Sequence, residues 1–406
     1  MNCRHCDSPL SHSFIDLGHA PPTNAYRTER DLKQPEVYYP LKVKVCSQCW
    51  LVQTEDYVDA AELFSPEYAY FSSTSTSWLA HAKDYANRII ERLHLNAESF
   101  VVEVASNDGY LLKNFIEYGI PCLGIEPTTS TAKAAENIGI HVLREFFGEA
   151  LAQSLVEEEK QADLIIGNNV YAHIPDINDF TRGLKALLKP QGTVTLEFQH
   201  LMPLITDVKF DTIYHEHFSY HSLFTLSKIF DSVGLKVWDA EKITTHGGSL
   251  RVYGCHKDDP RKETDAVKQI LNEEKSMGLQ TLAIYSEFQS RADKIKDDLL
   301  EFLIEQKKKG KKVVAYGAAS KGNTILNYAG IKPDLLTFVC DAAVAKQNKF
   351  MPGSHIPIKS PDAIFEADPD YVLVLPWNIL SEIKSQLSPG LPSAKFVVAV
   401  PKLTVE

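Results

Sequence analysis

The chain has 406 residues, of which 44% are hydrophobic and 23% are charged, and its formal net charge is −11 at pH 7. This length allows two or three domains with buried cores, and the composition is that of an ordinary soluble protein. The negative charge argues against a nucleic-acid or anionic-membrane surface but is compatible with a local basic pocket for a phosphorylated substrate. Because the sequence has neither an apolar run of membrane-spanning length nor a signal-peptide core, we expect a cytoplasmic protein.

Four cysteines near the N-terminus form two Cys-x-x-Cys pairs, Cys3 with Cys6 and Cys46 with Cys49. In a reducing compartment this spacing predicts a tetrahedral zinc site to which each pair contributes two thiolates. Four thiolates leave no open coordination position, so we expect a structural Zn²⁺ ion. Replacement of one thiolate by His5 or His12 is the alternative ligand set. We expect residues 1–70 to form this zinc-binding domain.

The pattern that follows the zinc-binding segment is that of an α/β domain. A helix is expected at about 78–93, and from residue 100 short apolar runs alternate with helical patterns. Strands are expected at 100–104, 121–125, 140–143, 162–167, 192–198, 234–238 and 250–254, and helices at 109–118, 130–138, 149–157 and 223–233. This alternation predicts a mostly parallel, doubly wound sheet in a central domain at residues 71–257.

A charged helical region at about 260–309 leads into a second alternating pattern. Its strand-like runs lie at 336–340, 371–376 and 395–400. We expect residues 258–406 to form a smaller α/β domain with this helical lead-in. The two α/β regions share no detectable sequence repeat, so tandem duplication is not supported.

The first strand of the central domain ends in a turn that contains Ser106, Asn107, Asp108 and Gly109. A dinucleotide site needs several glycines for close approach of the pyrophosphate, whereas this turn has one, and Asp108 would repel a phosphate. NAD is therefore disfavoured. S-adenosylmethionine carries a positive sulfonium and no phosphate, so the acidic and amide side chains of this turn suit it.

Two later strand ends complete the predicted cofactor site. Glu126 is placed to accept hydrogen bonds from ribose hydroxyls, and Asn168 and Asn169 follow a strand whose carboxyl end faces the ligand crevice. His173 comes next and could point toward the methyl acceptor, with a histidine satisfied inside the core as the alternative. The cofactor-binding residues that we predict are Glu103, Ser106, Asn107, Asp108, Gly109, Tyr110, Glu126, Asn168 and Asn169.

Residues 211–221 hold three histidines, two acids and two tyrosines, the densest group of proton-handling side chains in the chain. Histidine titrates near neutrality, a neighbouring carboxylate can fix its tautomer, and a tyrosine hydroxyl can stabilise an oxyanion. Such a set suits the removal of a proton next to a carbonyl group. A polar loop over the mouth of a domain is the alternative reading.

Together these motifs resemble the sugar C-methyltransferases that act on nucleotide-linked keto-deoxysugars. The resemblance covers essentially the whole chain, and it rests on the two cysteine pairs and on residues 104–109, 168–173 and 210–220. It implies a zinc-binding N-terminal domain, a central class I (Rossmann-like) S-adenosylmethionine methyltransferase domain and a Rossmann-like C-terminal domain. It also implies that Tyr214, Glu216 and His217 line the reaction site, together with His173 and, from the aromatic segment, Tyr68.

The resemblance implies carbon as the methyl acceptor, which needs an acidic C–H group beside a ketone. We expect His217 to remove the proton, Glu216 to orient or support His217, and Tyr214 to donate a hydrogen bond to the enolate oxygen, with assistance from His173. Proximity is the main contribution to the methyl transfer that follows.

The substrate diphosphate requires cationic or backbone donors, and two segments are candidates. Residues 244–251 offer His246 and Arg251, and residues 316–324 offer Lys321. In the second segment Lys321 precedes the second glycine instead of following it, so the Walker pattern fails, although a helix N-terminus could still bind the diphosphate. A structural strand–helix turn is the alternative.

Three other functions compete with C-methylation. A methyltransferase for oxygen or nitrogen would need the same donor loop but little carbonyl chemistry. A catalytically inactive zinc-domain binding protein would not bind the methyl donor, and a dehydrogenase is disfavoured by the poor glycine pattern of both loops. The fold alone does not choose among these functions.

Overall fold

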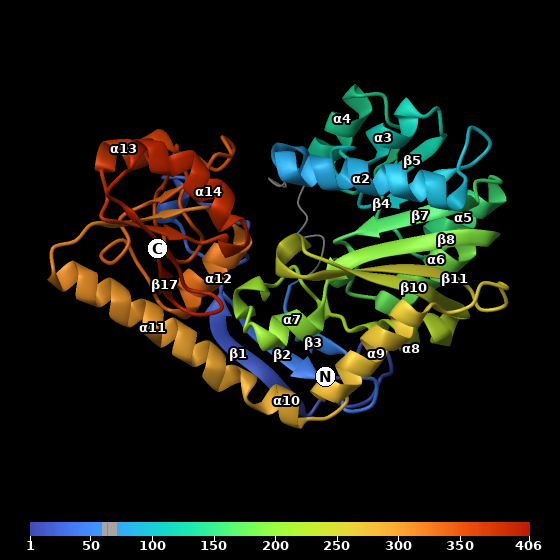
Figure 1. Ribbon diagram of the computed structural model, residues 1–406, viewed down its shortest axis with the longest axis horizontal. Helices are drawn as coiled ribbons and strands as arrows, with labels where there is room; N and C mark the ends of the chain where they lie inside the picture. Colours follow the sequence, from blue (N-terminus) through green and yellow to red (C-terminus); the bar gives the residue numbers. More distant parts are fainter. Residues whose placement is uncertain (59–62, 64–70) are drawn as a thin grey trace.

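The computed structural model describes residues 1–58, 63 and 71–406, without the side chain of His246. Within these residues the chain forms three β-sheets, of four, seven and six strands, and Figure 1 shows helices packed around the two larger ones. The predicted α/β fold class is confirmed. None of the described helices has both the length and the apolar character that a membrane crossing requires.

The seven-stranded sheet comes from the middle of the chain, residues 101–256, and lies on the right in Figure 1. Its strand order is β10-β11-β8-β7-β4-β5-β6, and β11 runs antiparallel to both neighbours, whereas β4 to β8 are mutually parallel. The strands are β4 (Val101–Val104), β5 (Cys122–Ile125), β6 (Val142–Leu143), β7 (Ala162–Asn168), β8 (Leu188–Gln199), β10 (Leu235–Ile243) and β11 (Ser249–His256). The predicted mostly parallel sheet is therefore confirmed, and its strand order reverses between β4 and β7.

Helices cover both faces of this sheet (Figure 1). One face carries α2 (Thr76–Leu93), α3 (Leu112–Glu117) and α4 (Thr129–Asn137). The other face carries α5 (Glu149–Glu157), α6 (Ile177–Leu187), α8 (Leu223–Val233) and α9 (Asp265–Met277). The sequence of α2 explains its packing on the sheet. Ser75 caps the first turn of the helix by accepting from the amide of Trp78, and the buried residues of α2 recur at helical spacing on one side.

The four-stranded sheet belongs to the N-terminal segment but includes a strand from far along the chain. Its order is β1 (His12–Ala20), β2 (Tyr39–Val45), β3 (Val52–Thr54) and β9 (Ser219–Tyr220). β9 pairs antiparallel with β3, so that Tyr220 lies opposite Val52. The polar block at 211–221 is therefore joined by backbone hydrogen bonds to the N-terminal sheet.

The six-stranded sheet is that of the C-terminal region, in the order β14-β13-β12-β15-β16-β17. Its strands are β12 (Val313–Tyr316), β13 (Val339–Cys340), β14 (Ile358–Lys359), β15 (Tyr371–Val374), β16 (Lys395–Val398) and β17 (Thr404–Val405). α11 (Phe288–Lys308) and α12 (Ser320–Tyr328) cover one face, and α13 (Asp362–Ala367) and α14 (Leu380–Leu387) cover the other. The strand order reverses between β12 and β15, which places a ligand crevice at their carboxyl ends.

One hydrophobic core joins the N-terminal sheet to the C-terminal sheet. It includes side chains of β1 and β2, of the short helices α7 (Leu201–Thr206) and α10 (Ala283–Ser286), and of α11, β12 and β15. The ring of Phe14 stacks on that of Phe288 with centroids 4.3 Å apart and meets Tyr285 edge-on at 5.8 Å. Packing therefore fixes the relative position of the elements around the polar block, since protein interiors are close-packed.

The connection between β1 and β2, residues 21–38, extends to the C-terminal sheet and is called the arm below. Arg27 and Phe350 exchange two backbone hydrogen bonds, of 3.0 and 2.8 Å. Figure 1 shows part of the blue N-terminal segment lying beside the orange and red C-terminal elements. The N-terminal segment thus contacts the C-terminal region through the arm and the block at 211–221 through β3.

Candidate active site and metal centre

The turn after β4 depends on backbone conformations with positive φ. Ala105, Asn107 and Gly109 have φ values of 56°, 50° and 78°. A Cβ atom at Gly109 would lie 2.3 Å from Cδ1 of Ile140, so glycine is required both by conformation and by space. The turn brings its side chains to the carboxyl end of β4, next to the end of β7.

Hydrogen bonds fix this turn from two directions. Oε2 of Glu126, at the end of β5, accepts from the amide of Asn107 at 2.9 Å. Oδ1 of Asn107 accepts from the amide of Ser72 at 2.9 Å, and Oδ2 of Asp108 accepts from that of Ser73 at 3.0 Å. The hydroxyl-rich segment before α2 therefore folds over the turn and closes one side of it.

The side chains around this turn fit S-adenosylmethionine. Burial, and then the nearby carboxylates of Asp108 and Glu126, raise the pKa of Glu103 well above its ordinary value. Several buried polar atoms have no hydrogen-bond partner among the described residues: Oε2 of Glu103, Oγ of Ser106, Oδ1 of Asp108, and both amide atoms of Asn168. Buried polar groups are normally paired, so these atoms suit a ligand with a positive charge and hydroxyl and amino groups.

A second cluster of polar side chains is centred on His217. Its ring centroid lies 4.0 Å from that of Tyr214 and 4.7 Å from that of His173, which it meets edge-on. Nδ1 of His217 lies 2.9 Å from the backbone oxygen of Thr212. Because a carbonyl oxygen can only accept, Nδ1 carries the proton and Nε2 is the basic nitrogen of the ring. His217 thus has the tautomer that a general base requires.

His173 packs against this ring, and Glu216 directly precedes His217 in the chain. The carboxylate of Glu216 is buried, and its Oε1 accepts from Nδ2 of Asn24 in the arm at 2.6 Å. Burial lowers the pKa of His173 to about 4, against a hydrogen bond to the backbone of Glu216 that raises it. His173 is therefore neutral at neutral pH and can act as a hydrogen-bond donor. Tyr68, the remaining predicted catalytic residue, lies outside the described residues.

The other polar residues of the block have different partners. Nε2 of His215 contacts the backbone oxygen of Pro40 at 3.2 Å, and Nε2 of His221 contacts that of Tyr171 at 3.3 Å. Burial lowers the pKa of both rings, that of His221 to about 3. Asp211 accepts from Nε1 of Trp377, which follows β15, at 2.7 Å. One of the three histidines thus belongs to the His217 cluster, and the other two brace the block against β2 and the loop after β7.

The residues predicted to bind the diphosphate have separate surroundings. Arg251 is fully buried and pairs with Glu197 at 2.7 Å and with Glu241 at 2.9 Å. Lys321 begins the first turn of α12, and its Nζ donates to Oδ1 of Asn378 at 2.6 Å and lies 4.8 Å from the ring centroid of Trp377. Two carboxylates neutralise Arg251. Lys321 lies at the carboxyl end of β12 and β15, where burial lowers its pKa, the carboxylate of Asp211 raises it and the charge of Lys209 lowers it.

The four N-terminal cysteines form one cluster. Their Sγ atoms all lie within 4.8 Å of one another, with Cys3–Cys49 and Cys6–Cys46 separations of 3.5 Å. Tetrahedral zinc with Zn–S bonds of about 2.3 Å would space its sulfurs by about 3.8 Å, so the arrangement fits.

The two knuckles that present these cysteines repeat one geometry. Asp7 and Trp50, which directly follow the second cysteine of each pair, have φ values of 58° and 64°. Their amides donate to the backbone oxygens of Cys3 and Cys46 at 2.9 and 3.0 Å. The chain therefore reverses in the same way at each Cys-x-x-Cys pair, which turns both thiols of a pair toward the same point.

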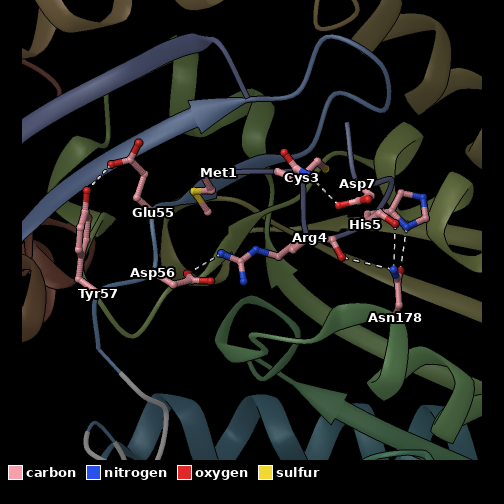
Figure 2. A pocket seen from close by; sticks show the side chains of 10 residues that line it. Met1, Cys3, Arg4, His5, Asp7, Glu55, Asp56, Tyr57 and Asn178 are labelled. Carbon is pink, nitrogen blue, oxygen red and sulfur yellow. Dashed lines mark hydrogen bonds and ion pairs between the residues drawn. The ribbon is translucent and has the colours of Figure 1, made fainter. Parts of the chain in front are cut away.

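The first knuckle also contacts the loop that carries His173. Figure 2 shows Arg4 reaching from the knuckle to Asp56, with a separation of 2.8 Å, and Asn178 facing the knuckle from below. Arg4 donates to the backbone oxygen of Pro175 at 2.8 Å. His5 contacts Oδ1 of Asn178 at 2.9 Å instead of joining the sulfur cluster. The first knuckle therefore supports the loop after β7, which the sequence did not indicate.

Two further features of the site could not be read from the sequence. The bond from Asn24 joins residues that are 192 positions apart, and no motif marks it. His81 of α2 contacts Oε2 of Glu197 at 2.9 Å beside Arg251. A hydrophilic residue on an amphipathic helix is an ordinary surface feature, so only the fold shows this contact.

Three family models match successive parts of the chain. A zinc binding domain matches residues 3–64, a methyltransferase domain matches residues 78–240, and a C-methyltransferase C-terminal domain matches residues 244–401. The C-methyltransferase NovU of Streptomyces niveus is 33% identical over 401 residues, which cover 98% of this chain and 95% of NovU. The likeness therefore extends over all three predicted domains.

Solved structures resemble parts of the chain only distantly. The PH0226 protein from Pyrococcus horikoshii OT3 has a TM-score of 0.39 and 14% identity, covering 50% of this chain and 100% of its own. Magnesium protoporphyrin IX methyltransferase from Synechocystis PCC 6803, solved with bound SAH, has a TM-score of 0.35 and 14% identity, covering 44% of this chain and 84% of its own. At these scores the likenesses carry no conclusion about this chain.

Proposed function

The chain belongs to the C-methyltransferase family and is an S-adenosylmethionine-dependent methyltransferase, and from this premise we propose that it methylates a carbon next to the ketone of a nucleoside-diphosphate-linked keto-deoxysugar. The observation that supports this most directly is the tautomer of His217, whose Nδ1 donates to Thr212 and whose Nε2 is left basic. A base of this kind is what proton removal next to a ketone needs. Methylation of a hydroxyl oxygen or an amine would need little of this carbonyl chemistry.

In the proposed mechanism, Nε2 of His217 takes the proton from the carbon beside the ketone, and the electron pair of that C–H bond forms the enolate. The carboxylate of Glu216 supports the imidazolium that results. Tyr214 donates a hydrogen bond to the enolate oxygen, and the neutral ring of His173 assists. S-adenosylmethionine supplies a methyl group to the nucleophilic carbon as its sulfur departs. Tyr68 is proposed to complete this site.

For the cofactor, we propose that the turn after β4 binds the amino-acid end of S-adenosylmethionine and that Glu126 accepts from the ribose hydroxyls. The proposed contacts are those of the predicted set: Glu103, Ser106, Asn107, Asp108, Gly109, Tyr110, Glu126, Asn168 and Asn169. The buried atoms of Glu103, Ser106, Asp108 and Asn168 that have no hydrogen-bond partner among the described residues support this assignment. We also propose that Cys3, Cys6, Cys46 and Cys49 hold a structural Zn²⁺ ion, supported by the spacing of the four sulfurs.

For the substrate diphosphate, we propose the start of α12, where Lys321 adds a positive charge to the backbone amides of the first turn. Nζ of Lys209 also lies near the Trp377 ring, 5.6 Å from its centroid, and pairs with Asp207 at 2.6 Å. His246 and Arg251 were predicted for the same role. The two carboxylates on Arg251 favour Lys321 over Arg251, and the side chain of His246 lies outside the described part of the chain. We further propose the division into domains at residues 1–70, 71–257 and 258–406.

The test is to incubate the protein with a panel of nucleotide-linked 4-keto-deoxysugars in deuterated water, with and without S-adenosylmethionine, and to follow mass and proton spectra. We expect a methyl group on carbon and donor-independent exchange of the adjacent C–H, with exchange abolished in His217→Ala. A methyl group on oxygen or nitrogen without exchange would refute C-methylation of the sugar. Absence of donor binding would favour an inactive binding protein.

A further inference from the structure

Asn24 lies in the arm, at the point where three parts of the chain meet. Its Nδ2 donates to Oε1 of Glu216 at 2.6 Å. Its Oδ1 accepts from Oγ of Ser320, the first residue of α12, at 3.3 Å. A single side-chain amide from the N-terminal segment therefore connects the carboxylate beside His217 to the crevice end of the C-terminal sheet.

Contacts on both sides hold this part of the arm in place. The backbone oxygen of Thr23 accepts from Nδ2 of Asn323 at 2.7 Å. The hydroxyl of Tyr26 donates to the backbone oxygen of Ala318 at 2.5 Å, and Arg27 pairs with Phe350 as described above. Every one of these partners belongs to the C-terminal region. Docking of the arm onto that region therefore holds Asn24 in position next to Glu216.

The hydrogen bond from the Asn24 amide affects the orientation of the Glu216 carboxylate. Glu216 is 2% exposed, so its carboxylate depends on protein donors instead of water. A hydrogen bond to an ionised carboxylate in such surroundings is stronger than one between neutral groups, and it selects one orientation of the carboxylate. Because Glu216 is adjacent in the chain to His217, a change in this orientation would move a negative charge close to the base and so alter the electrostatic field there.

We propose that Asn24 is a positioning residue for the methylation reaction, because it holds the carboxylate of Glu216 in the orientation that supports His217. Through Ser320, this orientation also depends on docking of the arm at the first turn of α12, the end where we place the substrate diphosphate. The proposal rests on the function proposed above, since Glu216 and His217 have their roles only in that reaction. Asn24 itself contacts neither substrate nor cofactor in this account.

The test compares four variants with the wild type. Asn24→Ala removes both hydrogen bonds. Asn24→Asp keeps the shape and still accepts from Ser320, but it places an oxygen against Glu216 in place of the donor. Ser320→Ala removes only the outer bond. Glu36→Gln is the matched control, because Glu36 docks the arm through Gly353 and His355, at 3.0 and 2.6 Å, away from Asn24.

The main readout is donor-independent C–H exchange of the sugar substrate in deuterated water, split into its maximal rate and the half-saturating sugar concentration. We expect Asn24→Ala and Asn24→Asp each to lower the maximal rate by about 10-fold to 100-fold, the range for loss of a hydrogen bond to a charged group. In both Asn24 variants the half-saturating sugar concentration and the S-adenosylmethionine Kd should stay within about threefold of the wild-type values. Ser320→Ala should lower the maximal exchange rate by less, and Glu36→Gln should exchange at the wild-type rate.

Two results would overturn the proposal. If Asn24→Asp exchanges at the wild-type rate, Asn24 contributes shape and not a donor. If Glu36→Gln loses as much as Asn24→Ala, docking of the arm and not the orientation of Glu216 explains the effect.

A crystal structure of Asn24→Ala separates this proposal from the proposed function, because it does not depend on finding the substrate. Glu216 in a new rotamer or without ordered density would support positioning by Asn24 even if no sugar is turned over. An unchanged Glu216 carboxylate would refute positioning even if the wild type is an active sugar C-methyltransferase.

Discussion

Substitution of Gly109 by alanine should separate two costs that glycine avoids in the cofactor turn. At φ 78° an alanine is strained whatever the space, and its Cβ would lie 2.3 Å from Cδ1 of Ile140 and 3.2 Å from Cβ of Ala135. The left-handed conformation costs about 1–2 kcal/mol, and overpacking of a filled site costs about 1–3 kcal/mol. We therefore expect Gly109→Ala to lose about 2–5 kcal/mol of unfolding free energy.

Gly119 offers the matched control. Its φ of 69° imposes the same conformational cost, but a Cβ there would meet nothing within 4 Å. Gly119→Ala should lose only the conformational cost, about 1–2 kcal/mol. Urea unfolding curves of both variants would measure the difference, and calorimetric titration with S-adenosylmethionine should show weaker binding for Gly109→Ala alone.

A rescue variant tests the assignment of the clash. Ile140→Val removes the Cδ1 atom that the new Cβ would meet, so Gly109→Ala combined with Ile140→Val should lose less than the sum of the single variants. A coupling of at least about 1 kcal/mol is expected for residues in direct contact. Equal losses for Gly109→Ala and Gly119→Ala, with additive behaviour in the double variant, would refute the reasoning.

Three further outcomes follow from the contacts described above. Removal of zinc with a chelator should lower the Tm and slow donor-independent C–H exchange, because Arg4 joins the knuckle to Pro175 near His173. The affinity for S-adenosylmethionine should stay within about threefold, because Arg4 does not contact the cofactor turn. Calorimetry after re-addition of Zn²⁺ is the control. Glu197→Ala should cost about 3–5 kcal/mol in urea unfolding, because it removes one partner of the fully buried Arg251, whereas Glu241→Ala, which removes its half-exposed partner, should cost less. Burial raises the pKa of Asp211 to about 6. Because the folded protein holds this proton to a higher pH than the unfolded chain does, the free energy of unfolding should fall by about 3 kcal/mol as the pH rises from about 4 to 6. Asp211→Asn should remove that part of the pH dependence, and an unchanged pH profile of stability would contradict this account.

Much of the fold was predictable from the sequence because the central strands are buried on both faces. Such strands appear as short apolar runs, and the helices between them show a separate period. The β9 strand is the instructive exception. β9 consists of two residues, Ser219 and Tyr220, within the polar block at 211–221. They pair with β3, which lies more than 160 residues earlier in the chain. No local pattern identifies a strand whose pairing is entirely non-local.

The sequence predicted which kinds of residue make up the candidate site, but it did not predict which groups each side chain contacts. Composition pointed to the block at 211–221, but its histidines look alike in sequence. Their roles differ because the chain crosses from the loop after β7 to the N-terminal sheet within this block. His215 reaches Pro40 and His221 reaches Tyr171, and His217 is left facing Tyr214 and His173. Arg251 shows the converse, since the sequence offered it as a cation for the substrate diphosphate, while the fold supplies it with two carboxylates.

The arrangement of the three sheets suggests why a carbon methyltransferase would carry the two outer regions. A methyl donor alone needs only the ends of β4, β5 and β7. Proton removal from carbon also needs a base with one tautomer and a fixed counter-charge, and neither comes from the central sheet. The block that carries His217 is anchored by β9 to the N-terminal sheet, and Glu216 is held from the arm, which is itself docked on the C-terminal sheet. In the mechanism that we propose, the outer regions supply the rigidity that a preorganised proton-transfer site requires.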